Sequence, residues 1–444
     1  MSYQPYFLLT DIIYFFLLFI CIIIIWRCRQ TRFFQQIKST LYSRKALCAL
    51  MIIFAYLTVA TLDSIHFTVV KSNQYFSKGR VISVLDILFE KTQAKHEKTY
   101  SKPLASHLFT AEKVMKNGIV TWVYPTLNIS QARLKSSVST TDFILRKICM
   151  TLGCTLSLFL LVYLLTFNLR KQKPYYAWRT FYITTIILLM FASIIIFTSS
   201  DYHLLGTDKV GNDILYVSLK SVRTAVLLGS ITMLIMLPFA IFFGMGAGYW
   251  GGKIDDMIQF VYTTLSAIPS VLLIIASVLA LQVFIERHDT FFSTMIMRAD
   301  IRLFVLCLIL GLTSWTSLCR VIRAETLKLR ELEYVQAAKV MGTPNLKILF
   351  RHIFPNVLHI ILITVILDFS MIILAEAVLT YVGVGVDPTT YSWGNMIDAA
   401  RMELARTPVV WWPLFSAFSF MFILVLAINI YVDVLRDKLD PRNS

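Results

Sequence analysis

The sequence predicts an all-α polytopic membrane protein, and three observations support that fold class. Of the 444 residues, 57% are hydrophobic and 15% are charged, whereas a soluble domain usually carries about 25% charged residues. The mean hydropathy of the chain is +0.69. Nine segments also reach the length of about 20 mostly apolar residues that a membrane-spanning helix needs. This composition excludes an ordinary soluble enzyme, a disordered chain and a collagen-like fibre.

The predicted spans and the charges between them give an orientation. The nine spans are Phe7–Trp26, Ala46–His66, Ile148–Phe167, Thr180–Ser199, Thr224–Tyr249, Met257–Phe284, Leu303–Leu318, Leu358–Tyr381 and Pro413–Val432. Short loops on the cytosolic side of a membrane are enriched in Lys and Arg. The loops after the first and third spans are basic, and so is the stretch Arg320–Arg351. They share one side if the N-terminus lies outside, although Arg146 and Lys147 then open the third span from the outer side. We therefore expect a multi-pass protein of the cytoplasmic (inner) membrane with a cytosolic C-terminus.

The polar segment Lys71–Asp142 is then an extracytoplasmic insertion, in which short apolar runs alternate with charge. The net charge of +16 would suggest nucleic acid as the partner of a soluble protein. Here the membrane orientation accounts for the basic loops, so no nucleic-acid binding is expected. The seven cysteines lie in or beside apolar segments without a CxxC pair or a Cys/His cluster. Neither a disulfide framework nor a metal site is expected.

The sequence lacks the motifs of the common hydrolytic enzymes. The segment Gly246–Lys253 comes nearest to a phosphate-binding loop, but its first glycine is out of register and Ile254 follows the lysine. No G-x-S-x-G or H-E-x-x-H motif occurs, and the seven histidines are scattered. We expect no catalytic residues in this chain. If the protein moves a solute uphill, the energy comes from a partner or from an ion gradient.

A cytosolic stretch from Trp315 to Asn356 carries the most informative pattern. Residues at helical spacing give it a small apolar face: Tyr334, Ala337, Ala338 and Met341. Gly342 is able to end that helix with a positive φ, and Thr343 is able to cap the next turn with Pro344 at its first position. Small alanines flanked by charges suit docking into a cleft of another protein. A plain amphipathic loop helix is the alternative that these residues leave open.

This stretch resembles the "EAA" coupling loop of ABC importer permeases. More narrowly, it resembles the second (C-type) permease subunit of the dipeptide, oligopeptide and nickel importers. In that family the loop presents a short helix to a separate ATPase subunit. The residues that the resemblance assigns to ATPase coupling are Glu333, Tyr334, Gln336, Ala337, Ala338, Gly342, Thr343, Pro344 and Asn345. Gln336 departs from the usual glutamate, which removes a charge from the docking surface.

Further motifs of the same family follow in the right order over residues 180–442. They are His203–Asp213 (H-x-L-G-T-D-x-x-G-x-D, with Asn212 for the usual arginine), Arg223 with Gly229, Gly248–Asp255, Ser266–Pro269, Glu376–Gly385 and Ser392–Met396. Phe260 and Thr263 stand where the family commonly has an arginine and an aspartate, so a polar pair expected near the gate is missing.

The resemblance implies a type I ABC importer transmembrane fold with a six-helix core. The core and its coupling loop would occupy 180–442 and 323–356, after two extra spans in 1–70, the insertion in 71–142, and a third extra span with a cytosolic loop in 143–179. The outer-loop residues that would contact a binding protein are His203, Gly206, Thr207, Asp208, Asp213, Trp393 and Asn395. Asp368 and Glu376, inside the eighth predicted span, are candidates to line the pathway; contact between helices is the alternative.

The expected function is that of a permease subunit forming half of an importer's pathway for di- or oligopeptides. Its expected partners are a second permease subunit in a heterodimer, two ATPase subunits, an extracytoplasmic solute-binding protein and membrane lipid. No cofactor is expected in this chain, because ATP and Mg would be bound by the ATPases. A nickel or metal-chelate importer is the alternative substrate class, and a secondary transporter the alternative mechanism.

Overall fold

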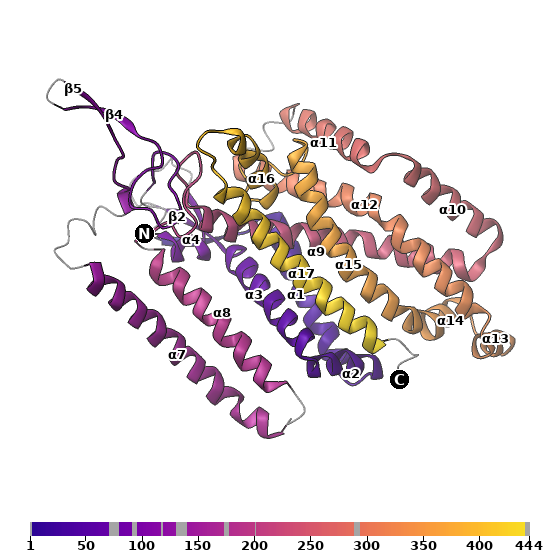
Figure 1. Ribbon diagram of the computed structural model, residues 1–444. Helices are drawn as coiled ribbons and strands as arrows, with labels where there is room; N and C mark the ends of the chain where they lie inside the picture. Colours follow the sequence, from indigo (N-terminus) through magenta and orange to yellow (C-terminus); the bar gives the residue numbers. More distant parts are fainter. Residues whose placement is uncertain are drawn as a thin grey trace. The chain divides into compact units, whose positions relative to one another are not determined.

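The computed structural model describes residues 2–70, 80–90, 96–116, 119–129, 140–172, 177–199, 201–287 and 294–439 (Figure 1). Parts of the predicted insertion, at 71–79, 91–95, 117–118 and 130–139, lie outside the described residues. The chain forms two compact units that interleave along the sequence. Unit 1 comprises Met1–Phe7, Lys38–Thr224 and Tyr391–Val434, and unit 2 comprises Leu8–Ile37, Ala225–Thr390 and Leu435–Ser444. The two units are not the four domains predicted along the sequence, and those domain boundaries stay a prediction.

Helices dominate the described residues. The α-helices are α1 (Leu9–Cys28), α2 (Arg32–Ser39), α3 (Arg44–Asp63), α4 (Val84–Leu88), α7 (Thr140–Gln172), α8 (Trp178–Thr198), α9 (Ile214–Trp250), α10 (Gly252–Ala267), α11 (Ser270–Arg287), α12 (Met295–Arg330), α13 (Glu333–Val340), α14 (Asn345–Ile348), α15 (Phe354–Tyr381), α16 (Trp393–Arg401) and α17 (Trp412–Leu439). Two short 3₁₀ helices are η1 (Thr40–Tyr42) and η3 (Glu403–Ala405), and η2 (Leu349–Ile353) is a π-helical turn.

Seven helical stretches in the described residues are long and apolar enough to cross a membrane: α1, α3, α7, α8, α9, α15 together with α14, and α17. An eighth is the pair α10 and α11, if these two helices, bent by 79° at their junction, form one broken span. The polytopic prediction is confirmed, and the break falls at the predicted Ser266–Pro269 motif. The predicted span Leu303–Leu318 is not among these eight. It lies inside α12, where Arg302 and Arg320 bracket an apolar stretch shorter than the usual 20 residues.

Two small antiparallel sheets, which the sequence did not predict, belong to unit 1. In the first, the order is β1 (Ser2–Tyr6), β2 (His66–Val70) and β3 (Arg80–Ser83). The second is a hairpin of β4 (Glu112–Lys116) and β5 (Ile119–Val123), with Lys113 opposite Trp122 and Met115 opposite Val120. One of the short apolar runs of the predicted insertion, at 119–124, therefore forms strand β5.

A buried charge cluster joins three segments of unit 1. The Lys220 ammonium on α9 lies 2.8 Å from Asp86 Oδ1 and 3.8 Å from Asp63 Oδ1. Ser83 donates a 2.6 Å hydrogen bond to Asp63, and Tyr216 donates one of the same length to Asp86. Burial opposes ionisation of Asp86, but Lys220 outweighs it and lowers the pKa of that carboxyl. The end of α3, the start of α4 and the first turns of α9 are thus held by one cation.

In unit 2 the first helix is part of the packed structure. Asp300, at the start of α12, accepts hydrogen bonds from the backbone amide of Thr10 (3.3 Å) and from the Thr10 hydroxyl. A carboxylate at this end of α1 also interacts favourably with the helix dipole. On the neighbouring helices, a Cβ added at Gly229 would lie 2.5 Å from the Phe369 ring, so α9 and α15 need a glycine there. The helix that the sequence predicted as an extra span before the core therefore packs on α12.

The charge cluster of unit 1 predicts a stability effect. In Lys220→Met the two carboxylates lose their buried cation, and removing one partner of a buried pair typically costs about 3 kcal/mol. We expect a clearly lower Tm for this variant in detergent. The matched control is Lys209→Met, because the Lys209 side chain is exposed. Equal melting temperatures for the two variants would contradict the role given to Lys220.

Candidate functional site

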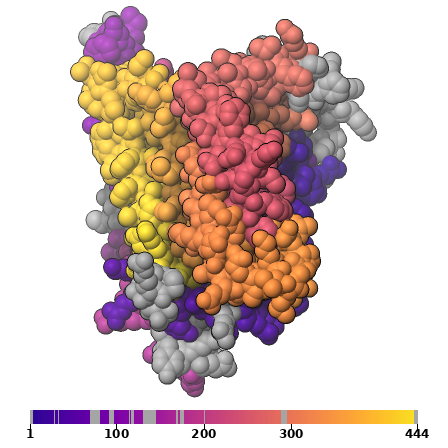
Figure 2. Space-filling model, turned by 90° about the vertical axis from the view of Figure 1, so that its right-hand side faces the viewer, coloured from indigo at the N-terminus to yellow at the C-terminus, as the bar shows by residue number. Residues whose placement is uncertain are grey.

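The stretch from Trp315 to Asn356, which belongs to unit 2, has the predicted helix, break and second helix. α12 continues to Arg330, and α13 follows after a two-residue turn. After the break, α14 and η2 lead into α15. Figure 2 shows this region, in orange, at the lower right of the face in view.

One side of α13 is exposed and the other is held inside unit 2. Val335 and Ala338, three residues apart, are 2% and 8% exposed. On the open side, Val340 and Met341 are 87% and 84% exposed, and Tyr334 is 43% exposed. The predicted apolar face is correct for Tyr334, Ala337 and Met341, which are exposed, but wrong for Ala338. Ala338 joins Val335 on the inward side because three-residue spacing places both on one helix face.

The C-terminus of α13 ends as predicted, whereas the next helix begins differently. Gly342 has φ +75°, and its amide donates to the Lys339 carbonyl over 3.1 Å. The Thr343 amide donates to the Ala338 carbonyl, also over 3.1 Å. The prediction that Thr343 caps the next helix is wrong, because α14 starts at Asn345 with Pro344 as its N-cap residue. The backbone amide of Thr343 is used to close α13 instead.

Hydrogen bonds tie this coupling region to neighbouring helices. The Gln336 side-chain amide donates to the Arg330 carbonyl over 3.0 Å, a bond that an ionised glutamate at this position cannot donate. Arg330 in turn donates to the Gly248 carbonyl over 3.3 Å. Tyr249 donates to the Asn345 side chain over 2.9 Å. Two predicted motifs, the Gly248–Asp255 turn and the coupling loop, therefore meet in unit 2.

An ion pair fixes the turn itself. Arg323 on α12 binds both carboxylate oxygens of Asp255, the last residue of the predicted turn, over 2.5 and 2.6 Å. This bidentate geometry is the strongest form of an Arg–carboxylate contact. Arg320 donates to Ser266 over 2.9 Å on the same pair of helices. Where the usual polar pair is missing, Phe260 is 73% exposed and Thr263 is exposed as well, so α10 makes its polar contacts with α12 from other positions.

The loop from His203 to Asp213 in unit 1, which the sequence predicts to be an outer loop, is organised around a buried histidine. Nδ1 of His203 lies 2.7 Å from Asp213 Oδ2, and its Nε2 lies 3.7 Å from Glu97 Oε1. Burial alone would lower the pKa of His203, but the two carboxylates outweigh it and raise the pKa to about 9. Burial has the opposite effect on a carboxyl and would raise the pKa of Glu97. His203 and the amides of Asn128 and Ile129 outweigh burial and hold the pKa of Glu97 below its ordinary value. The histidine is therefore a buried cation at neutral pH.

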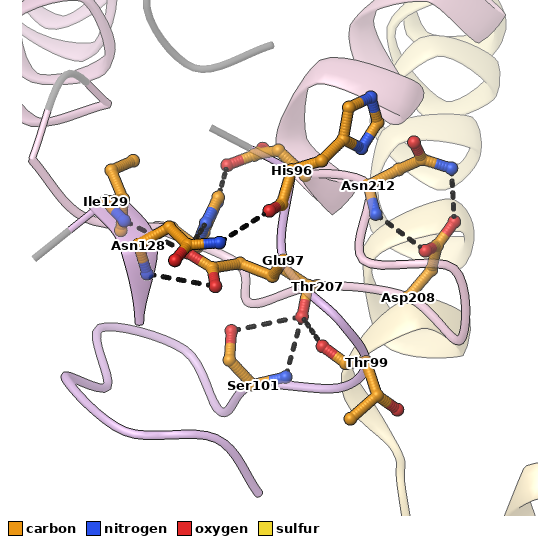
Figure 3. Close-up of polar contacts among 11 residues, drawn as sticks. His96, Glu97, Thr99, Ser101, Asn128, Ile129, Thr207, Asp208 and Asn212 are labelled. Carbon is orange, nitrogen blue, oxygen red and sulfur yellow. Dashed lines mark hydrogen bonds and ion pairs between the residues drawn. The ribbon is translucent and has the colours of Figure 1, made fainter. Parts of the chain in front are cut away.

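Two more motif residues organise the same loop, one by binding the insertion and one by binding within the loop (Figure 3). The Thr207 hydroxyl donates to the Thr99 carbonyl over 2.9 Å and accepts from the Ser101 amide over 2.7 Å. Asp208 accepts from the backbone amide and the side-chain amide of Asn212, at 2.8 and 3.0 Å. Asn212, which replaces the usual arginine, thus contributes to closing the loop on itself.

Gly211 is needed in this loop because the backbone of Glu97 lies directly against it. Gly211 has φ +86°, and a Cβ there would lie 1.9 Å from the carbonyl oxygen of Glu97. Gly206 is buried as well, with Trp412 against it. The Trp412 indole donates to the Thr207 carbonyl over 3.1 Å. The loop thus lies against both the insertion and the start of α17.

The predicted outer-loop residues differ in their exposure. His203 and Thr207 are at most 1% exposed and Asp213 is 6% exposed, so their side chains shape the loop from within. Trp393 is 1% exposed and donates from its indole to the Ser218 carbonyl over 3.1 Å. Asn395, whose amide is capped by the Ser392 hydroxyl at 3.0 Å, is partly exposed. A direct contact with a binding protein stays a prediction for these residues.

The two acidic candidates on α15 have different surroundings. Glu376 is 3% exposed and accepts a 2.9 Å hydrogen bond from Thr380, one turn along the helix. Asp368 is partly buried. The hydrogen bond of Glu376 lies within α15, so a pathway-lining role and a structural contact between helices both stay predictions. Among the described residues, no cluster of three or more His, Cys, Asp or Glu side chains has the geometry of a metal site.

Sequence reasoning missed the residues of the insertion that hold the loop. Glu97, Ser101 and Asn128 lie outside the recognised motifs, and their spacing follows no helical or strand period. Glu97 binds the Asn128 amide and lies beside His203, and the Ser101 amide donates to the Thr207 hydroxyl; the partners in each pair lie more than 30 residues apart in the sequence. The one signal in the sequence is that the insertion contains a carboxylate, Glu97, that is able to pair with His203.

The protonated histidine predicts a pH dependence. Since the pKa of His203 is raised from 6.5 to about 9 on folding, its contribution to stability is complete below the lower value and is lost as the pH rises through the upper one. We expect the Tm in detergent to fall over that range, and His203→Gln to flatten this slope. His96→Gln is the control, because the His96 side chain is exposed. An unchanged slope in His203→Gln would contradict the buried-cation assignment.

Comparisons with known proteins agree on one family. The family described as "Binding-protein-dependent transport system inner membrane component" matches residues 240–444, which include the coupling region. The oligopeptide transport system permease protein OppC of Bacillus subtilis is 30% identical over 240 residues, covering 54% of this chain and 72% of the relative. The dipeptide permease protein DppC of Alkalihalophilus pseudofirmus is 32% identical over 240 residues, with the same coverage.

A further relative is the glutathione transport system permease protein GsiD of Pectobacterium atrosepticum. It is 31% identical over 243 residues, covering 55% of this chain and 74% of the relative. The similarity to these relatives agrees with the family motifs in the sequence and with the apolar helices of the structure. This chain therefore belongs to the binding-protein-dependent transport system inner membrane components, as a multi-pass permease subunit of an ABC peptide importer.

Proposed function

We propose that this chain forms half of the translocation pathway of an importer for di- and oligopeptides and couples that pathway to separate ATPase subunits through α13. The observation that carries the proposal is the presentation of α13. Its end is among the most exposed apolar surface of the described residues, with Val340 and Met341 both more than four-fifths exposed. A small exposed apolar surface with polar neighbours is typical of a protein interface.

The contacts of α13 suit the transmission of force. The inward side chains Val335 and Ala338 and the Gln336 amide fix the helix to unit 2. On either side of α13, Arg330 of α12 and Asn345 of α14 are hydrogen-bonded to the end of α9. A load applied to α13 is therefore passed to α9 and α12 and does not dissipate in a loose loop. Rigid elements joined by packed side chains are what such coupling needs.

The mechanism that follows is alternating access. Two permease subunits enclose the pathway, and the solute arrives from an extracytoplasmic binding protein at the outer loops. ATP binding closes the ATPase pair, draws the coupling regions together and turns the pathway outward, and hydrolysis reverses the movement. ATP and Mg belong to the ATPase subunits. This chain contributes a two-state set of helices whose equilibrium both the ATPases and the binding protein shift.

Exposed apolar side chains on α10 support a second permease subunit as a partner. Met257 and Phe260 are 70% and 73% exposed, and Ile254 is 48% exposed. Figure 2 shows this helix, in crimson, along the face in view. In a spanning helix such a face contacts either lipid or another subunit. In the proposed heterodimer, α10 faces the second subunit and α13 lies beside the ATPases.

The coupling proposal predicts an uncoupling variant. Gly342→Asp adds a charge at the exposed end of α13, where an added Cβ meets no atom within 4 Å. Gly342→Asn is the matched control, because asparagine has nearly the same size, tolerates positive φ and carries no charge. With the complete importer in proteoliposomes, we expect Gly342→Asp to lower peptide uptake per ATP hydrolysed about tenfold, as a loss of 1.4 kcal/mol at the docking surface would. Equal coupling in both variants would remove α13 from the mechanism.

The substrate class is tested by uptake into the same proteoliposomes. We expect ATP-dependent accumulation of labelled di- or oligopeptides and no accumulation of Ni²⁺. Accumulation of Ni²⁺ or a nickel chelate in place of peptides would replace the peptide proposal by the metal alternative. Peptide uptake that persists without ATP and stops when the proton gradient is removed would favour a secondary transporter instead.

A further inference from the structure

The β4–β5 hairpin of the insertion exposes a row of apolar side chains on one face. Residues at alternate positions of a strand share a face, so Met115 lies with Val120 and Trp122. We name these three residues the hairpin stripe. They are 74%, 54% and 65% exposed. Tyr124, directly after β5, is 58% exposed as well. A two-stranded ribbon buries neither of its faces by itself, so this row is available to a partner.

The base of the hairpin is firmly held. Backbone hydrogen bonds of 2.9 to 3.0 Å join Leu108 to Pro125 and Leu127 to Ser106. The side chains of Leu108, Leu127 and Ile129 form a small buried core just below it. Through Glu97, the same segment is joined to His203 in the outer loop. The hairpin is therefore a fixed extension of that loop.

A cavity adjoins the base of the hairpin. Its volume is about 470 Å³, in the range of sites that take a side chain or a small ligand. It is lined by Lys102, Phe109, Pro408, Val409, Trp411 and Trp412, among others. Trp411 and Val409 are about half exposed, and the Phe109 ring meets the Trp412 ring edge-on at 5.2 Å between centroids. An aromatic pocket of this kind accepts one anchoring apolar side chain of a partner.

A lysine lies beside the hairpin stripe, and another lies beside the cavity. The Lys113 ammonium lies 5.0 Å from the centre of the Trp122 ring, and the Lys102 ammonium lies 5.1 Å from the centre of the Phe109 ring. Both lysines are exposed. A partner that presents carboxylates around an apolar patch therefore meets complementary charge at two places.

The direction of the hairpin favours a partner in the aqueous phase. Within unit 1 the hairpin extends past the outer ends of α3 and α17, on the side away from the apolar lengths of these helices (Figure 1). A lipid-bound hairpin would instead lie beside the helix ends, where interfacial tryptophans gather.

We propose that the hairpin stripe and the adjoining cavity form a docking surface for the extracytoplasmic solute-binding protein. The binding protein places an apolar side chain in the cavity and lays an apolar patch with acidic neighbours on the stripe, near Lys113. This inference rests on the proposed function, because only an importer of this type has such a partner. It adds a contact made by the insertion itself, beyond the loops of the permease core.

The test measures stimulation of ATP hydrolysis by the importer's own binding protein, titrated into proteoliposomes that contain the complete importer. We expect Trp122→Ala to raise the half-stimulating concentration about tenfold, as interface tryptophans do when truncated. Val120→Ala raises it less, and Val123→Ala leaves it unchanged. Val120 and Val123 undergo the same chemical change on opposite faces of β5, so the pair separates a docking effect from a general loss of the hairpin.

The outcomes distinguish this inference from the proposed function. If the wild-type importer shows no stimulation by any concentration of binding protein, the proposed function fails and the docking surface fails with it. If the wild type is stimulated and Trp122→Ala has the same half-stimulating concentration, the docking surface alone is overturned. A variant that keeps this concentration but releases the second permease during purification would assign the stripe to that subunit. Quenching of Trp122 fluorescence in the wild type by a lipid-borne quencher would assign the stripe to the membrane. Either result would overturn the inference.

Discussion

A charged side chain without a polar partner is costly in and beside membrane-spanning helices. The polar contacts that satisfy such charges lie where distant segments of the chain come together. Lys220 joins the ends of α3 and α4 to α9 in unit 1. Asp300 joins α1 to α12 in unit 2, and Arg323 joins α12 to the Gly248–Asp255 turn. His203 does the same for the insertion and the outer loop. Apolar burial gives each helix its place, but these polar contacts determine which segments meet.

Much of the fold followed from local patterns in the sequence. Apolar length gave the spans, and Gly342 gave the end of α13, because a positive φ at that point requires a residue without a Cβ penalty. The Ser266–Pro269 motif gave the break between α10 and α11. These features depend on a few neighbouring residues, so a sequence read without a structure contains them.

Other features depend on contacts between distant residues and could not be read in advance. The inward side of α13 is chosen by what packs against Ala338, and the periodicity of the helix leaves that choice open. The residues that position the outer loop, Glu97 and Asn128, belong to no motif. The pairing of β4 with β5 likewise needed the structure, since a short apolar run is compatible with either a strand or a helical turn. The insertion, outside the family pattern, was therefore the least predictable part and contains the least expected surface.

The amide of Gln336 has a consequence for the physical character of coupling. Gln336 donates to a backbone carbonyl where the family usually has a charge, and Val340 and Met341 at the end of α13 are more than four-fifths exposed. An interface formed by apolar burial gains little from charge attraction, so ionic strength affects it weakly. Its driving force instead decreases on cooling, as hydration of apolar surface becomes less unfavourable. Under the proposed coupling, the contact between α13 and an ATPase subunit therefore depends more on temperature than on ionic strength.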